Sequence, residues 1–243
     1  MGVTFVLGRA GSGKTRYCVD GLARALADDS DSRPLMLLAP VQAAFQMERA
    51  LAQRSPRGGY MRAEVLSFSR LARRVLDAQG APVELLDSGA RRMALRHLLS
   101  QPGADLRAFG RSAHTSGFTE QLQQTLADWM QEGLTPAELR AAADGAGPRT
   151  AARVEALAGV YEAYLAWLGS RADPAQRLEL LERRLLEGAL PDGLRLWVDG
   201  FAGFTGLELR VLVALAARAA EVHVTLMLDP RGEQSDADDP GHL

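Results

Sequence analysis

The hydrophobic pattern changes twice along the chain. Near both ends, short continuous apolar runs stand between glycine, proline or polar turns, and most are followed by apolar positions at helical spacing. Such runs are typical of parallel strands that are buried on both faces and joined by helices. The predicted strands are 4–7, 35–39, 63–68, 194–199 and 222–228, and the predicted helices between and after them are 14–27, 41–53, 69–78 and 206–219.

Strand signals disappear between about residues 82 and 190. Five helices are predicted there: 88–99, 119–131, 135–143, 150–168 and 174–186. Thr135 to Glu138 is a predicted capping box with proline at the first helical position, and Ser88 is the expected N-cap of the first of these helices. One apolar stripe is expected to be bundle core rather than a cofactor site: Leu157, Val160, Tyr161, Tyr164, Leu165 and Leu168.

The sheet pattern therefore stops and resumes, which predicts an α/β domain interrupted by an inserted α-helical domain. The expected boundaries are 1–85 for the first part of the sheet domain, 86–190 for the insertion, 191–230 for the second part, and 231–243 for an acidic loop or truncated end.

Composition narrows the class of protein. The chain has 243 residues, 47% hydrophobic and 24% charged, with a net charge of −2, which excludes disorder as the main state and argues against a strongly basic nucleic-acid module. No apolar run reaches the length of roughly 18 residues that a membrane span needs. The single cysteine, Cys18, cannot form an internal disulfide, a four-thiolate zinc site or an iron–sulfur cluster, and we expect a small core residue in a cytoplasmic protein.

The first strand runs into a G-x-x-x-x-G-K-T string. In such a loop, small residues turn backbone N–H groups toward phosphate oxygens, and the helix that follows directs its positive dipole end at them. Lys14 is the only lysine among the 28 basic residues, and its compact ammonium suits a phosphate in a way that a guanidinium does not. The predicted nucleotide-binding residues are Gly8, Arg9, Ala10, Gly11, Ser12, Gly13, Lys14 and Thr15.

The strand 194–199 ends on a carboxylate, Asp199, as a Walker B strand does. Together with the hydroxyl of Thr15, this side chain is the expected Mg²⁺ site beside the nucleotide. The expected cofactors are therefore ATP and Mg²⁺.

Four strings resemble motifs of the UvrD/Rep-type superfamily 1 helicases: Phe5–Thr15, Leu38–Ala44, Val65–Ala72 and Val198–Thr205. Within that superfamily, the strings S-F-x-R-L-A-x-R and V-D-G-F-x-x-F-T are similar to those of the AddB family, the B subunits of bacterial AddAB ATP-dependent helicase/exodeoxyribonucleases. The resemblance covers essentially the whole chain.

This resemblance implies a P-loop NTPase (RecA-like) fold and a heterodimer with an AddA-type helicase–nuclease subunit. It also implies action on DNA double-strand ends for recombinational repair, with Chi recognition on single-stranded DNA. Members of the family carry a C-terminal nuclease domain with a four-cysteine iron–sulfur cluster, for which this chain has no matching positions. The sequence is therefore expected to be the N-terminal piece of a longer protein.

The chain departs from working helicases at Gly200, where superfamily 1 enzymes have the glutamate that polarises the attacking water. A sensor glutamine is not convincing at Gln234, and a second RecA-like lobe has no counterpart here. We therefore expect Mg–ATP binding with poor hydrolysis, no catalytic residues in this segment, and no motor activity from it alone.

Ligands gather at the carboxyl ends of strands in open α/β sheets, so the residues at and just after the ends of two of the predicted strands are candidates for contact with single-stranded DNA. They are Gln42, Ser67, Phe68, Ser69 and Arg70. An alternative interpretation places Phe68 in the core and Arg70 on a solvated helix.

Two other functions are open from the residues. A P-loop small-molecule kinase would use the helical block as a lid, with Arg91–Arg92 or Arg183–Arg184 near the γ phosphate. The second alternative is an interaction scaffold, in which the phosphate loop is only a structural relic of a nucleotide site. His97 and His114 lack metal-ligand spacing and are expected to be surface or structural residues.

Overall fold

The computed structural model describes residues 2–55, 59–78, 86–101, 106–169, 171 and 173–228, apart from the side chain of His114. It divides into two compact units. The sheet unit comprises residues 1–75, 182–204 and 208–243, and the helical unit comprises residues 76–181 and 205–207. The predicted acidic segment 231–243 and Gln234 lie outside the described residues.

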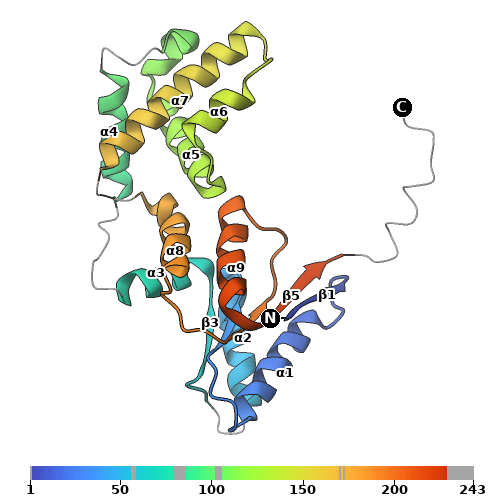
Figure 1. Ribbon diagram of the computed structural model, residues 1–243. Coiled ribbons are helices and arrows are strands. Elements are labelled where there is room, and N and C mark those ends of the chain that lie inside the picture. Colours follow the sequence, from blue (N-terminus) through green and yellow to red (C-terminus); the bar gives the residue numbers. More distant parts are fainter. Residues whose placement is uncertain are drawn as a thin grey trace, which may run out of the picture. The chain divides into compact units, whose positions relative to one another are not determined.

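Among the described residues, the sheet unit contains five parallel strands in the order β1-β5-β4-β2-β3, which confirms the predicted α/β class (Figure 1). Parallel register brings their carboxyl ends to one edge, since Leu38 of β2 pairs with both Val198 of β4 and Leu66 of β3. The loops that follow these strands therefore open side by side. The strands are β1 (Gly2–Gly8), β2 (Leu35–Leu38), β3 (Ala63–Leu66), β4 (Leu194–Val198) and β5 (Ala219–Met227).

Helices cover both sides of this sheet. On one side, α1 and α2 share a core with the strands that includes Leu22, Leu37, Leu51 and Trp197, each at most 1% exposed. On the other side Figure 1 shows α3, α8 and α9. Leu196, which neighbours Trp197 in β4 and therefore points to the opposite face, is also buried. The helices are α1 (Lys14–Ala27), α2 (Val41–Arg54), α3 (Phe68–Ala78), α8 (Arg177–Leu186) and α9 (Gly206–Arg218).

The first strand differs from its prediction as a buried element. β1 occupies the edge of the described sheet, and Val3, Phe5 and Leu7 are 45%, 60% and 49% exposed. A continuous apolar run predicts a strand but not its place in the sheet, because edge and central strands of a parallel sheet share that pattern.

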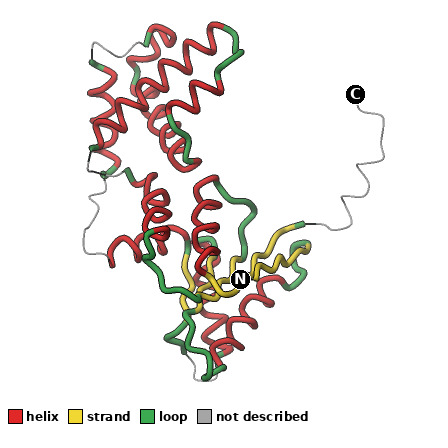
Figure 2. The backbone as a smooth tube through the Cα atoms, viewed as in Figure 1, coloured by secondary structure: helices red, strands yellow, loops and turns green. Residues whose placement is uncertain are grey.

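In its described residues, the helical unit is built mainly from the helices α4 to α7 and two 3₁₀ segments (Figure 2). The predicted α7 stripe lies in its core: Val160, Tyr161, Tyr164 and Leu168 are buried, and Leu157 and Leu165 pack against them. The elements are α4 (Ser88–Leu99), η1 (Arg107–His114), α5 (Ser116–Glu132), α6 (Pro136–Ala142), α7 (Pro148–Leu168) and η2 (Pro174–Gln176).

Helix starts test the capping predictions. The capping box at Thr135 is confirmed, because its hydroxyl accepts from the Glu138 N–H at 3.2 Å and the Glu138 carboxylate accepts from the Thr135 N–H at 2.8 Å. The prediction of Ser88 as an N-cap is wrong: Asp87 caps α4 by accepting the Ala90 N–H at 2.7 Å. An aspartate one residue earlier has the longer reach and an ionised oxygen to offer the helix end.

Candidate functional site

The Gly8–Thr15 loop joins the end of β1 to the start of α1. Gly13 is the N-cap of α1 with φ at +90°, a left-handed conformation that a residue with a Cβ rarely adopts. The first turn of α1 contains no acidic residue, so its unpaired N–H groups and positive dipole end face no competing carboxylate of their own helix. The loop thus has the local geometry of an anion site.

Lys14 folds back across this loop. Its ammonium donates to the carbonyl oxygens of Gly8 at 2.7 Å and Arg9 at 2.8 Å. An ammonium has three N–H donors, so these two bonds fix the side chain against the loop and leave one donor for a further acceptor. The position of the only lysine is therefore set by the backbone that it crosses.

Asp199 follows β4 and is 2% exposed. Its Oδ1 accepts a hydrogen bond from the Thr225 hydroxyl at 2.5 Å, and its backbone N–H donates to Leu38 O at 3.0 Å. Its Oδ2 is buried and has no hydrogen-bond partner among the described residues. An ionised oxygen without a partner is costly in a protein interior, which marks this atom as one that fits a cation.

A cavity of about 360 Å³ lies between the loop and Asp199. Asp199 is the acidic side chain among the described residues that line it, and the described residues contain no cluster of three or more His, Cys, Asp or Glu able to hold a metal. This donor set fits Mg²⁺, which takes one or two protein ligands and fills its octahedron with phosphates and water. The lining residues are Ala10, Gly11, Ser12, Gly13, Lys14, Thr15, Asp199, Gly200, Phe201, Thr225 and Met227.

Cys18 lies in α1 and is fully buried, as predicted. Burial, together with the negative charge of Asp199, raises the pKa of its thiol to about 12. A thiol in that state is protonated at neutral pH and is neither a nucleophile nor a metal ligand.

Gly200 follows Asp199 with φ at +85°. A Cβ added there would lie 3.2 Å from Cδ of Pro40, closer than carbon atoms normally pack. The chain therefore lacks a water-orienting carboxylate at this position. A glutamate there would also be strained, because the backbone has a conformation that residues with a side chain rarely adopt.

Comparison with known proteins adds the family. A family model described as "ADDB, N-terminal" matches residues 5–242. The chain belongs to this AddB N-terminal family.

Several curated relatives of this AddB-family chain are named as the B subunits of ATP-dependent helicase/deoxyribonucleases. The chain is 43% identical over 95% of its length to the one from Pelotomaculum thermopropionicum, and 41% identical over 99% to the one from Heliobacterium modesticaldum. The corresponding protein of Moorella thermoacetica is 43% identical over 95% of the chain. The chain spans about one fifth of the length of these relatives.

The five candidate DNA residues of this AddB-family chain fall into two groups. Ser67 and Phe68 are 3% and 5% exposed: the Ser67 hydroxyl accepts the Arg70 N–H at 3.3 Å at the start of α3, and Phe68 packs on other aromatic rings. This local cap starts a helix at Phe68, where the sequence pattern predicts a strand. Gln42 and Ser69 are exposed, and Arg70 is half-exposed and paired with Glu48 at 2.7 Å.

The exposure of two apolar side chains near these residues is not predicted by the sequence pattern. Val41 and Phe45, one turn apart on α2, are 64% and 71% exposed. The sequence predicts a helix over 41–53 but does not specify which of its apolar residues face the core, and the buried ones are Ala44, Met47 and Leu51.

A polar network on β5 is also absent from the sequence predictions. Tyr17 Oη lies 3.0 Å from His223 Nδ1, and His223 Nε2 lies 2.8 Å from the Glu221 carboxylate, which also accepts from Arg195 at 2.7 Å. Although burial favours the protonated acid, the bonds from His223 and Arg195 hold the pKa of Glu221 below its ordinary value. This network ties α1 and β4 to β5; its members come from three separate elements and carry no motif.

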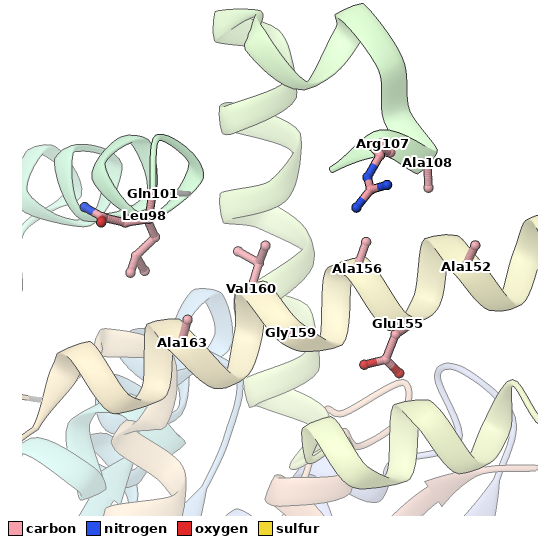
Figure 3. Close-up of a pocket in the computed structure, with 10 residues that line it drawn as sticks. All are labelled: Leu98, Gln101, Arg107, Ala108, Ala152, Glu155, Ala156, Gly159, Val160 and Ala163. Carbon is pink, nitrogen blue, oxygen red and sulfur yellow. The ribbon is translucent and has the colours of Figure 1, made fainter. Parts of the chain in front are cut away.

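A larger cavity, of about 740 Å³, lies in the helical unit (Figure 3). One wall of this cavity is α7, where the small residues Ala152, Ala156 and Gly159 leave space beside the helix. Arg107 and Glu155 also line the cavity. Size alone does not make it the functional site, since its described lining offers no motif and no buried unpartnered polar atom. The glycine-rich loop, Lys14 and the unpartnered carboxylate oxygen of Asp199 lie instead at the smaller cavity of the sheet unit.

The comparisons give the kinase alternative no support, and two of the arginines that it would use, Arg91 and Arg184, have partners. Arg91 pairs at 2.8 Å with the buried carboxylate of Asp173 inside the helical unit, and Arg184 pairs with Glu187 at 2.8 Å on the surface of α8. Among the described residues, no helix is both long and apolar enough to cross a bilayer.

Proposed function

We propose that the Gly8–Thr15 loop binds a Mg–nucleoside triphosphate, with ATP as the expected nucleotide, in a RecA-like P-loop domain carrying an inserted helical domain. The observation that supports this most is the buried, unpartnered Oδ2 of Asp199 at the wall of the cavity that the loop forms. Burying such an oxygen without compensation costs about 1–3 kcal/mol, and a divalent cation offers the compensation.

Each part of the site has a distinct task in this proposal. The loop N–H groups and the α1 dipole hold phosphate oxygens, and the remaining donor of Lys14 reaches the β and γ phosphates. The hydroxyl of Thr15 and the carboxylate of Asp199 would hold the Mg²⁺, which neutralises phosphate charge when bound. The Thr225 hydroxyl keeps Asp199 in place by donating to its other oxygen.

Hydrolysis is expected to be poor, because water attack on phosphate needs a group that orients the water. No described acidic side chain other than Asp199 lines the cavity, and Asp199 is committed to the cation. The nucleotide therefore acts as a structural or regulatory ligand rather than as fuel for a motor in this segment.

The family supplies the setting. Because its relatives are named as B subunits of an ATP-dependent helicase/deoxyribonuclease, we propose that the longer protein acts with an AddA-type helicase–nuclease subunit on DNA ends during recombinational repair. Chi recognition on single-stranded DNA and an iron–sulfur cluster outside this segment belong to the same proposal.

Within this segment, the proposed DNA surface lies beside the nucleotide cavity. Gln42, Ser69 and Arg70 offer polar groups for the phosphate backbone, and the exposed ring of Phe45 offers a stacking face for a base. Val41 extends the apolar part of this surface by one helical turn. Ser67 and Phe68 are buried and do not contact DNA in this proposal: the Ser67 hydroxyl caps the start of α3, and Phe68 packs in the core.

The test is Mg–ATP binding by the 243-residue chain, measured by calorimetry with and without Mg²⁺. Lys14→Ala removes one charge-assisted bond, worth about 1.5–3 kcal/mol, and is expected to weaken binding roughly 10- to 150-fold. Arg16→Ala is the matched control, since the Arg16 side chain is 79% exposed and pairs with Asp20 on the outer side of α1. Equal affinity in wild type and Lys14→Ala would overturn the proposal, and no binding by the wild type would leave only the scaffold function.

A further inference from the structure

A small cavity of about 150 Å³ lies within the helical unit, where the end of α4, the end of η1 and the start of α5 meet. It shares no lining residue with the nucleotide cavity or with the apolar cavity along α7. One of the described side chains that line it is basic and none is acidic. Its polar lining residues are Arg96, Ser100, Thr115, Ser116 and Thr119.

The start of α5 offers backbone N–H groups to this cavity. Thr115 is the N-cap, and its hydroxyl accepts from the Phe118 N–H at 3.2 Å. In the part of the chain that the structure describes, nothing accepts from the N–H groups of Ser116 and Gly117, the first two of the helix. Because α5 is 17 residues long and has no acidic side chain in its first turn, its positive dipole end is open to an anion.

Thr119 distinguishes this cavity from an ordinary helix start. Its side chain lines the cavity and is only 5% exposed, and its hydroxyl has no hydrogen-bond partner among the described residues. The hydroxyl oxygen is not one of the described unpartnered atoms that protein encloses completely, so it reaches the cavity. Polar groups this deep in a protein are normally paired, and a ligand in the cavity would be the partner that this hydroxyl lacks.

Arg96 supplies positive charge at the cavity. Its side chain is exposed and has no acidic partner among the described residues, and the same is true of Arg92, one turn earlier on α4. Residues four apart on a helix have Cβ atoms about 5–6 Å apart, so the two arginines form a line of charge that leads to the cavity. A nucleic-acid strand carries one phosphate per nucleotide and can meet both.

The end of α4 does not account for Arg96. An arginine in the last turn of a helix ordinarily offsets the negative end of the dipole. Here the last carbonyl oxygens are already bonded by Ser100, whose N–H donates to Arg96 O and His97 O at 3.1 Å and whose hydroxyl donates to His97 O at 2.7 Å. The guanidinium is therefore left for an acceptor in the cavity.

We propose that this cavity binds one phosphate group and that a nucleic-acid strand supplies it. The phosphate oxygens accept from the N–H groups of Ser116 and Gly117. The Thr119 hydroxyl and the Arg96 guanidinium donate to the same group, and Arg92 meets the next phosphate of the strand. This site is separate from the surface proposed on α2 and α3, and it needs no nucleotide at the phosphate loop.

The test follows the backbone amide signals of the isotopically labelled 243-residue chain by nuclear magnetic resonance. Three probes are titrated: a short DNA single strand of mixed sequence, the same strand with uncharged methylphosphonate linkages, and inorganic phosphate. The signals of Ser116 and Gly117 are expected to shift with the DNA strand, to shift with inorganic phosphate only at higher concentration, and to stay in place with the uncharged strand.

Two substitutions, each with a matched control, locate the site. Arg96→Ala removes a charge-assisted bond and is expected to weaken strand binding about tenfold or more, whereas Arg149→Ala removes an exposed arginine that does not line the cavity. Thr119→Val is expected to weaken binding about 2- to 10-fold without lowering stability, because its hydroxyl has no partner to lose. Thr125→Val is its control on the same helix, where the hydroxyl donates to Gln121 O at 2.9 Å.

Three results would overturn the proposal. Signals of Ser116 and Gly117 that stay in place with every probe would show that the cavity binds no phosphate. Inorganic phosphate that binds as tightly as the strand would show a site for a free ion and not for nucleic acid. Wild-type affinity in both Arg96→Ala and Thr119→Val, or equal shifts with the uncharged strand, would show that the strand binds elsewhere. Mg–ATP binding by the phosphate loop is measured separately and can fail without affecting any of these results.

Discussion

Restoring the missing acid with Gly200→Glu is expected to fail. In the helicases that this chain resembles, a glutamate follows the aspartate that Asp199 matches, so the substitution looks like a repair. The structure opposes it, because Gly200 has φ at +85° and its missing Cβ faces Pro40. The variant is expected to lose stability and to gain no ATP turnover.

The expected change in the free energy of unfolding is the sum of two opposing effects. Holding a non-glycine residue at positive φ costs about 1–3 kcal/mol, and the contact with Pro40 at 3.2 Å adds to it. Replacing glycine also restricts the unfolded chain, which returns about 0.4–1 kcal/mol. The net loss is therefore about 1–2 kcal/mol, which lowers a urea midpoint by roughly 0.5–1 M at an m-value of about 2 kcal/mol/M.

The assay must report the sheet unit alone, because two units need not unfold together. Trp197 on β4 serves if Trp129 and Trp167 of the helical unit are first replaced by phenylalanine. Urea unfolding is then followed by fluorescence for wild type, Gly200→Ala and Gly200→Glu, and turnover is measured with Mg–ATP. Gly203→Ala is the matched control: a Cβ there meets no described atom within 4 Å.

Gly200→Ala is expected to account for most of the loss, because the strain arises at the backbone and at Cβ. Two results would refute the reasoning. Gly200→Glu as stable as Gly203→Ala would show that the loop accepts a side chain, and Gly200→Glu with new ATP turnover would show that the position still points at the reacting water.

The other predictions concern the polar network and the sheet edge. The pKa of Glu221 is lowered in the folded chain, so its contribution is present above its ordinary value of 4.5 and is lost as the pH falls below it. Unfolding free energy should therefore decline below about pH 4.5, and Glu221→Gln should make that decline shallower, as urea titrations at several pH values would reveal. On β1, Phe5→Ser should change stability by less than about 0.5 kcal/mol because the ring is exposed, and should reduce concentration-dependent association through the open edge. Light scattering measures the second effect, and unchanged association would show that the edge is not adhesive.

Much of the fold could be predicted because local pattern and tertiary structure agree. The helix Lys14–Ala27 follows a glycine loop with no competing signal, and the box at Thr135 defines its own helix start with two hydrogen bonds. Predictions fail where the outcome depends on distant residues, or on a single local hydrogen bond that the pattern does not specify. The exposure of Phe5 depends on which strand lies beside β1, and the helical start at Phe68 depends on a hydroxyl that could equally have faced a strand.

The candidate site divides in the same way. Lys14 and Asp199 are predictable because each follows a strand in a recognisable string, and parallel register then brings them to one edge. The unpartnered Oδ2 and the aromatic connection from Phe201 to Phe68 could not be predicted, since both depend on how elements distant in sequence pack. The exposure of Phe45 on α2 could not be predicted either, because it depends on which face of the helix packs on the sheet.

Substitution of Asp199 also distinguishes a working nucleotide site from a structural relic of one. A relic has no reason to keep a buried carboxylate oxygen without a partner, so Asp199→Asn should leave the unliganded chain as stable as wild type or up to about 2 kcal/mol more stable. The same change should abolish Mg²⁺-dependent nucleotide binding. Such a trade between stability and binding is typical of functional sites and not of structural ones.

The helical unit offers a matched comparison in Asp173. That carboxylate is also buried, but it accepts from the Tyr164 hydroxyl at 2.6 Å and the Ala175 N–H at 2.8 Å, and it pairs with Arg91. Asp173→Asn leaves Arg91 without its counter-charge and should cost about 3–5 kcal/mol, with nucleotide affinity unchanged. If urea unfolding shows equal losses for the two substitutions, Asp199 is a structural residue like Asp173, and the case for a cation beside the loop falls.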